Sequence, residues 1–168
     1  MLEKAAAFEP YSAEEKKSKI TLLNSLGYYF YKKAERAENK QARDELMMRS
    51  NDYLNRASDI AYHELITWKT RGFVNMNKGY VQIAEQEFDH VLHSDHCDTL
   101  SLLGKAVMAF NRGRFGDSLR FFKNIARQNP FAPIDLRFSI ATCYYKLGQV
   151  EKARKLFEVL LEMVSTPY

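Results

Sequence analysis

The sequence predicts an all-α protein in which antiparallel helical hairpins stack as an α-solenoid. Its composition supports this class, because helix-forming Ala, Leu, Lys, Glu and Arg are plentiful while the 168 residues include only 7 Gly and 4 Pro. A glycine also recurs at a nearly fixed interval, since Gly79, Gly113 and Gly148 lie 34 and 35 residues apart. Each stands between two amphipathic segments, neither of which can bury its apolar face alone. We therefore expect each of these glycines to be the turn of a hairpin.

The first predicted element is a lengthened helical hairpin over residues 12–62. Small residues that mark the close crossing of two helices fall at Gly27 and Ser50, 23 positions apart, whereas the next unit has 12 between Gly72 and Ala84. The additional residues lie in AERAENKQARDEL, which contains neither Gly nor Pro. Eleven residues are about three helical turns, so both helices could lengthen and keep their register. An insertion that forms a loop is the alternative.

Three ordinary units follow, at residues 65–98, 99–132 and 134–166. Phe88, Phe122 and Phe157 repeat at the same intervals as the glycines. This is the period of the tetratricopeptide repeat, in which small residues stand where paired helices cross and an aromatic stands where the next unit docks. Ser118 departs from the pattern, which usually has Ala there, and Gly104 and Gly116 have no role in it. We expect one domain, residues 1–168, in a right-handed superhelix.

Composition and charge exclude several classes of protein. No apolar run approaches the roughly 18 residues that cross a bilayer, and the N-terminal residues lack the apolar core of a secretory signal. The 2 cysteines make no disulfide framework, which predicts a reducing, intracellular compartment. The net charge of +4 is uneven, at −2 over residues 1–98 and +6 over residues 99–168, and such asymmetry can mark an acidic partner of the C-terminal half.

The sequence offers no enzyme chemistry. His90, His93, His96 and Cys97 are of metal-ligating types, but the repeat register places the first two on an outer helix face and the others in a turn, so we expect solvated histidines and no metal. Cys143 has no basic activator in register and is expected to be a buried small side chain. No phosphate-binding glycine loop, nucleophile elbow or carboxylate pair is present. We expect no cofactor and no small-molecule substrate.

The remaining candidate is a binding surface. In tetratricopeptide folds the first helices line a concave groove, and the groove positions here hold aromatic and large aliphatic side chains that suit an extended or helical peptide. A segment of the same protein filling this groove, or packing of these side chains against neighbouring helices, is the alternative. The candidate groove residues are Tyr28, Tyr31, Phe73, Met76, Leu103, Val107, Phe110, Asn111, Phe138 and Tyr145.

A second candidate surface is the basic face formed by Arg120, Lys123 and Arg127, which are spaced along one helix. Such a stripe can meet phosphates with salt-dependent affinity. No base-stacking aromatics are interleaved with it, so a solvated helix face is the favoured interpretation and nucleic-acid binding the weaker one.

Three stretches carry a more specific resemblance. LLGKAVMAFN (102–111), NPFAP (129–133) and DLRFSIATCYYKLGQVEKARKLFE (135–158) resemble the N-terminal tetratricopeptide array of the large scaffold subunit of the RNA polymerase II-associated factor (PAF) complex. LLNSLGYYFYKKAERAENK (22–40) resembles the lengthened hairpin of that family, and the likeness spans residues 22–161. Family members are several times longer, so we expect this chain to be a fragment.

The resemblance implies a nuclear, non-enzymatic scaffold of transcription elongation. Its partners would be other PAF-complex subunits and RNA polymerase II, with links to chromatin modification and no membrane. The alternatives are a cytosolic tetratricopeptide adaptor for an unrelated peptide, and a zinc-dependent or nucleic-acid-contacting module built on the histidines or the basic face.

Overall fold

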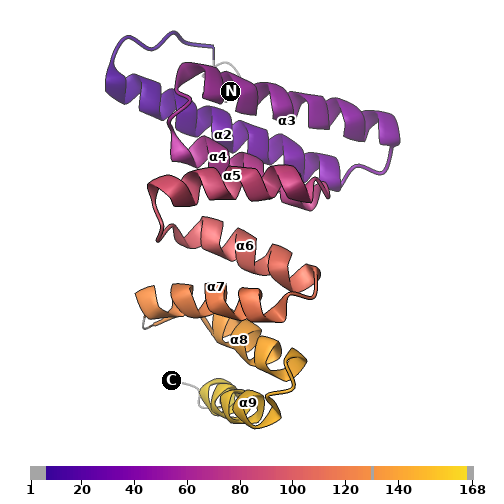
Figure 1. The fold of residues 1–168 in the computed structure, drawn as a ribbon. Coiled ribbons are helices and arrows are strands. Elements are labelled where there is room, and N and C mark those ends of the chain that lie inside the picture. The colour runs from indigo at the N-terminus through magenta and orange to yellow at the C-terminus, as the bar shows by residue number, and fades with distance from the viewer. Residues whose placement is uncertain (1–6, 130, 166–168) are drawn as a thin grey trace. The chain divides into compact units, whose positions relative to one another are not determined.

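The computed structural model describes residues 7–129 and 131–165, and this part of the chain forms eight α-helices (Figure 1). Consecutive helices pair as antiparallel hairpins, which confirms the all-α class of stacked helical hairpins. None of the described helices is long and apolar enough to cross a membrane. The helices are α2 (Ala13–Glu35), α3 (Lys40–Ile60), α4 (Leu65–Asn77), α5 (Val81–Ser94), α6 (Thr99–Asn111), α7 (Phe115–Gln128), α8 (Ile134–Lys146) and α9 (Val150–Ser165).

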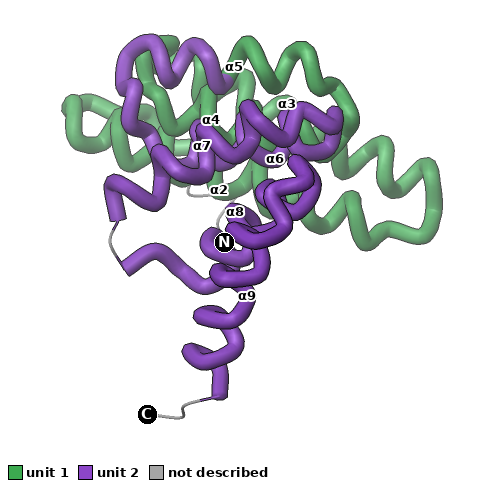
Figure 2. Tube along the Cα trace, turned by 60° about the horizontal axis from the view of Figure 1, so that its bottom comes forward, with its two compact units in different colours: residues 1–87 green, residues 88–168 purple. Residues whose placement is uncertain are grey.

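The chain divides into two compact units, Met1–Glu87 and Phe88–Tyr168, which Figure 2 colours separately. The first unit contains α2, α3, α4 and the start of α5. The second contains the end of α5 and the helices α6 to α9. The sequence predicts a single domain, and the division between the units falls inside α5.

The first hairpin is long because the inserted residues are helical. α2 has 23 residues and α3 has 21, with only residues 36–39 between them. Ser12 begins α2 with a capping box, in which its hydroxyl accepts from the Glu15 N–H and the Glu15 carboxylate accepts from the Ser12 N–H. The Asn39 side chain caps α3 by accepting from the Gln41 N–H. No loop insertion is present here.

The three repeated glycines terminate the first helix of their hairpins. Gly79, Gly113 and Gly148 have φ of 83°, 74° and 73°, the left-handed conformation that glycine adopts without strain. At each site the next residue donates its N–H, at 2.9 Å, to a carbonyl five residues earlier, as from Tyr80 to Asn75 and from Gln149 to Tyr144. This is the Schellman motif, so the hinges predicted from the glycine spacing are confirmed.

The core of the first unit lies between α2, α3 and α4. Phe30 of α2 stacks on Tyr53 of α3, with ring centroids 5.5 Å apart. The buried Ser50 hydroxyl donates to the Gly27 carbonyl at 2.8 Å, where a Cβ on Gly27 would come within 2.7 Å of Leu54. The two long helices therefore cross closely at Gly27, as the sequence predicts.

The core of the second unit lies between α6, α7 and α8. The buried Ser118 hydroxyl of α7 donates to the Ala106 carbonyl of α6 at 2.9 Å, and the buried Cys143 thiol of α8 lies 3.5 Å from the same hydroxyl. Burial raises the pKa of the Cys143 thiol, which confirms the prediction of a buried small side chain. The core side chains are Leu102, Ala106, Phe122, Ile125, Ala132, Leu136, Ile140 and Cys143.

Candidate protein-binding surfaces

The candidate groove residues of α2 differ sharply in exposure. Tyr28 is 44% exposed, whereas Tyr31 is 2% exposed and packs with Leu54 and Val74. Burial and the hydrogen bond to Glu35 raise the pKa of the Tyr31 hydroxyl. Tyr31 is therefore a core residue, and its assignment to a binding groove is wrong, because the face of α2 that it occupies is covered by α3 and α4.

Lys32 links the exposed and buried tyrosines of α2. Its Nζ atom lies 5.8 Å from the ring centroid of Tyr28 and 5.5 Å from that of Tyr31, and it pairs with the Glu35 carboxylate at 2.7 Å. The hydrogen bond to Glu35 raises the pKa of Lys32. The bonds from Lys32 and then Tyr31 lower the pKa of Glu35. Tyr28 therefore lies beside a lysine that already forms an ion pair within the same helix.

The α4 candidates, Phe73 and Met76, are half-buried. They offer only part of their side chains as contact surface. Two other α4 side chains, Arg71 and Asn75, make the polar contacts of α4 with α3 and α5.

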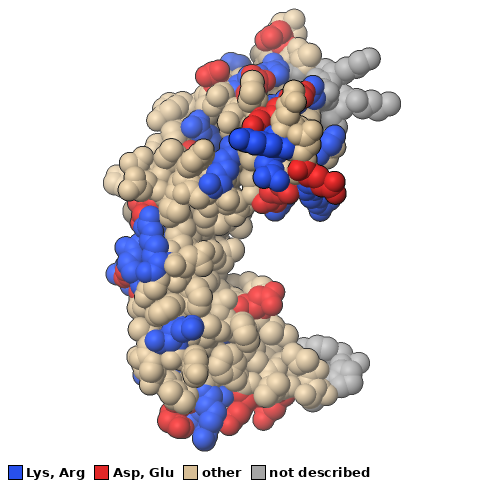
Figure 3. Space-filling view, turned by 90° about the vertical axis from the view of Figure 1, so that its right-hand side faces the viewer, with Lys and Arg blue, Asp and Glu red and all other residues tan. Residues whose placement is uncertain are grey.

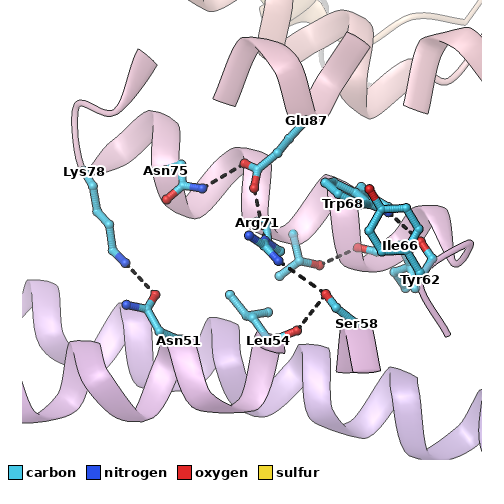
Figure 4. Close-up of polar contacts among 11 residues, drawn as sticks. Asn51, Leu54, Ser58, Tyr62, Ile66, Trp68, Arg71, Asn75, Lys78 and Glu87 are labelled. Carbon is cyan, nitrogen blue, oxygen red and sulfur yellow. Dashed lines mark hydrogen bonds and ion pairs between the residues drawn. The ribbon is translucent and has the colours of Figure 1, made fainter. Parts of the chain in front are cut away.

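A buried carboxylate holds three helices of the first unit together (Figure 4). Glu87 of α5 is 3% exposed, and it accepts from Arg71 Nε at 3.1 Å and from Asn75 Nδ2 at 2.8 Å. Arg71 also donates to the Ser58 hydroxyl of α3 at 3.4 Å. Burial raises the pKa of Glu87, an effect that the Asn75 bond and the Arg71 charge oppose.

The aromatic end of this network lies at the turn between α3 and α4. Trp68 donates from its indole nitrogen to the Tyr62 carbonyl at 2.7 Å, and the two rings meet edge to face with centroids 4.9 Å apart. The Arg71 guanidinium lies 5.6 Å from the Trp68 ring centroid. In Figure 4 the Trp68, Tyr62 and Ile66 side chains gather at one end of the network and Lys78 with Asn51 at the other. These contacts give Arg71 a structural role.

The candidates on α6 are mostly part of the core. Leu103, Val107 and Phe110 are half-buried and pack against the core of the second unit. The Phe110 ring meets Phe115 edge to face, with centroids 5.2 Å apart. Asn111 at the end of the helix is exposed. α6 therefore offers the edges of apolar side chains and one amide.

The aromatic candidates on α8 are the most exposed of the apolar groove candidates. Phe138 and Tyr145 are 55% and 59% exposed. The Phe138 ring rests against Phe157 of α9, with centroids 5.6 Å apart, so it is held in place while most of its surface stays open. Large aromatic side chains that are both ordered and exposed are typical of protein-binding surfaces.

A pocket that the sequence did not reveal lies between α6, α7 and α8. Its volume is about 530 Å³, and its lining combines a buried apolar floor with small polar groups and one carboxylate. Leu103 is the candidate groove residue that also lines it. The lining residues are Thr99, Leu103, Phe122, Ile125, Gln128, Asn129, Pro133, Asp135, Leu136 and Ser139.

The predicted basic face lies on α7. Arg120, Lys123 and Arg127 are exposed, but Arg120 pairs with Asp117 at 3.3 Å and its guanidinium lies 5.4 Å from the Phe121 ring centroid. On the face of the molecule shown in Figure 3, most Lys and Arg side chains lie beside Asp or Glu side chains. A solvated face agrees with this arrangement.

The histidine cluster is dispersed. His93, His96 and Cys97 are exposed, and His96 Nδ1 lies 2.6 Å from the Leu92 carbonyl oxygen. Among residues 7–129 and 131–165, no three His, Cys, Asp or Glu side chains converge as a metal site.

Two known proteins are similar in sequence to most of this chain. The chain is 37% identical over 156 residues to Protein CTR9 homolog of Arabidopsis thaliana, a match that covers 92% of this chain and 14% of that protein. The chain is related to the CTR9 proteins. RNA polymerase-associated protein CTR9 of Caenorhabditis elegans is 26% identical over 153 residues, covering 88% of this chain and 13% of that protein. The relationship confirms the resemblance to the tetratricopeptide scaffold subunit of the PAF complex, and it agrees with the prediction of a non-enzymatic protein.

Solved structures with the same fold support the hairpin architecture of this CTR9 relative. A mutant of MamA superimposes with a TM-score of 0.63 at 19% identity, covering 96% of this chain and 83% of that one. PilW, a type IV pilus biogenesis factor, superimposes with a TM-score of 0.68 at 15% identity, covering 91% and 70%. At these identities the likeness concerns the fold alone. No protein-family model matches the chain.

Proposed function

We propose that the chain is a scaffold segment of a PAF-complex subunit and that it holds a segment of another subunit through the exposed side chains of α6 and α8. The observation that carries this proposal is the 37% identity to a CTR9 homolog over 92% of the chain. The Caenorhabditis elegans relative is named for its association with RNA polymerase. A nuclear location and links to RNA polymerase II and chromatin modification belong to the same proposal.

The exposed aromatics of α8 support the binding role. Phe138 and Tyr145 lie seven residues apart on one helix, a spacing of two turns that puts both on the same face. Interface hot spots are commonly aromatic side chains that become buried at the centre of a contact. Asn111 at the end of α6 adds an exposed amide for hydrogen bonding to a partner backbone.

Capture of purified PAF-complex subunits, offered one at a time to the immobilised chain, tests the proposal. We expect one subunit to bind, and we expect Tyr145→Glu and Phe138→Glu each to weaken its binding about tenfold or more, the loss typical of a hot-spot residue. Tyr11→Glu is the matched control, because Tyr11 is 93% exposed and lies outside the candidate groove. Circular dichroism should show unchanged helicity in all three variants.

Two results would contradict the proposal. One is that no PAF-complex subunit binds the chain, which would favour a cytosolic adaptor for an unrelated peptide. The other is that both α8 variants bind the subunit as tightly as the Tyr11→Glu control, which would place the interaction elsewhere on the chain.

A further inference from the structure

The pocket of the second unit has the size and lining of a side-chain binding site. Its floor is formed by Phe122 and Ile125 of α7 and Leu136 of α8, all of them buried. Its volume of about 530 Å³ lies within the ~300–1,000 Å³ that is usual for binding pockets. A pocket of this volume has room for a large apolar side chain.

The charge at the pocket lining is negative. Asp135 is its only charged lining residue, it is exposed, and its carboxylate has no ion-pair partner in the described part of the chain. The nearby Asp98 differs, because its carboxylate accepts the Ser101 N–H at 2.8 Å as the cap of α6. Although residues 99–168 carry a net charge of +6, a cation placed at the pocket itself would meet the available carboxylate of Asp135.

Polar side chains also line the pocket. Thr99 donates to the Gln128 side-chain oxygen at 3.4 Å, which ties the start of α6 to the end of α7. Ser139 lines the pocket and is followed along α8 by the exposed face that holds Tyr145. The pocket thus adjoins the surface proposed above to bind a partner segment.

From this geometry we propose that the pocket is the anchor site for a partner segment of defined chemistry. A large aliphatic or aromatic side chain enters between α6, α7 and α8, and a Lys or Arg close to it in the partner pairs with Asp135. The inference rests on the proposed function, because it names the partner chemistry at one end of the same surface. It assigns the cationic specificity to Asp135, which composition and repeat register do not single out.

Selection from a random dodecamer peptide display library provides a probe. We expect enriched peptides to share a large apolar residue with Lys or Arg within about one helical turn of it. A synthetic consensus peptide should bind Asp135→Asn about fivefold more weakly and Asp135→Lys at least tenfold more weakly, with a reduced salt dependence. Asp117→Asn is the matched control, since Asp117 also stands in the first turn of a helix but does not line the pocket.

A pocket-filling variant tests the apolar half of the site. Ser139→Trp places an indole at the pocket, and Ser25→Trp is its control, since both serines donate to the carbonyl four residues earlier and Ser25 lies on α2. We expect only Ser139→Trp to abolish peptide binding. If that variant unfolds, Asp135→Asn and Asp135→Lys test the inference by themselves. Asp135 is exposed, so its replacement leaves the core intact.

Three outcomes would overturn this inference: peptides enriched without a basic residue, equal affinity of Asp135→Lys and wild type, or self-association of the chain that Ser139→Trp removes, which would make a second copy the occupant. These outcomes are separable from failure of the proposed function. If Tyr145→Glu loses the PAF-complex subunit while Asp135→Lys and Ser139→Trp retain it at full affinity, the scaffold proposal stands and the anchor site is wrong.

Discussion

The ring of Phe88 lies against the backbone of Gly104, so closely that a Cβ on Gly104 would be 2.5 Å from two of its ring carbons. Phe88 is fully buried in the middle of α5, and Gly104 stands in the middle of α6. The absence of a side chain at Gly104 is what lets the aromatic ring pack there. The sequence assigned no role to this glycine, and that assessment is wrong.

Replacing Gly104 by Ala should destabilise the second unit. Overpacking a buried ring costs about 1–3 kcal/mol, and the better helix propensity of Ala offsets up to about 1 kcal/mol. We expect a net loss of about 1 kcal/mol in the free energy of unfolding, measured with urea.

Gly116 is the matched control for Gly104. It also lies in a helix, but a Cβ there would have no neighbour within 4 Å. Gly116→Ala should therefore stabilise the chain by about 0.5–1 kcal/mol. Adding Phe88→Leu to Gly104→Ala should cost less than the sum of the two single changes, and strict additivity would show that the ring contact is not the cause.

The Ser118 hydroxyl supports a second prediction. It is buried between α6 and α7, where it donates to the Ala106 carbonyl. Ser118→Ala removes a buried hydrogen bond while filling most of the same space, so we expect a loss of about 1 kcal/mol in the free energy of unfolding. Ser139→Ala is the control, because that hydroxyl donates within its own helix. An unchanged or raised stability of Ser118→Ala would show that the residue is a neutral departure from the repeat pattern.

Local sequence rules were sufficient for the architecture. The interval of the glycines identified three helix ends, because only a left-handed residue allows the Schellman bonds that close α4, α6 and α8. A run of 13 residues without Gly or Pro predicted that α2 and α3 would lengthen, because it lacks the two residues that most disfavour a helix, and only the short turn of residues 36–39 interrupts it. These features depend on residues close together in the chain.

Features that depend on the packing of several helices were not predictable in this way. Tyr31 was placed on a surface because helical periodicity gives a direction but not which neighbour covers it, and α4 covers Tyr31 through Val74. The role of Gly104 required knowing where Phe88 points. The pocket beside Asp135 draws its lining from α6, α7 and α8, and no single repeat contains it.

The basic face of α7 should contribute little to folding. Arg120, Lys123 and Arg127 are exposed, and exposed ion pairs such as that of Arg120 with Asp117 contribute about 0–1 kcal/mol. We expect the triple change to Gln to leave the free energy of unfolding within about 0.5 kcal/mol of wild type and subunit capture unaltered. Loss of binding to a fluorescent single-stranded RNA in that variant, with a lower salt slope, would instead reveal a nucleic-acid surface.

Glu87 should make the stability of the first unit depend on pH. Burial raises its folded pKa above the ordinary 4.5, so the folded chain binds the proton more tightly than the unfolded chain. The resulting stabilisation is fully present below 4.5 and is lost as the pH rises through the folded pKa. The difference in unfolding free energy, wild type minus Glu87→Gln, should therefore fall as the pH is raised from 4.5, because Gln does not titrate.

Arg71→Gln provides the second arm of this experiment. It removes the cation that opposes the effect of burial on Glu87, so the folded pKa of Glu87 should rise further and the fall should extend to higher pH. Urea unfolding of the three proteins across the pH range measures both effects. A flat difference would mean that folding leaves the pKa of Glu87 unchanged, and a difference that grows with pH would mean that the Arg71 and Asn75 contacts outweigh burial and lower that pKa.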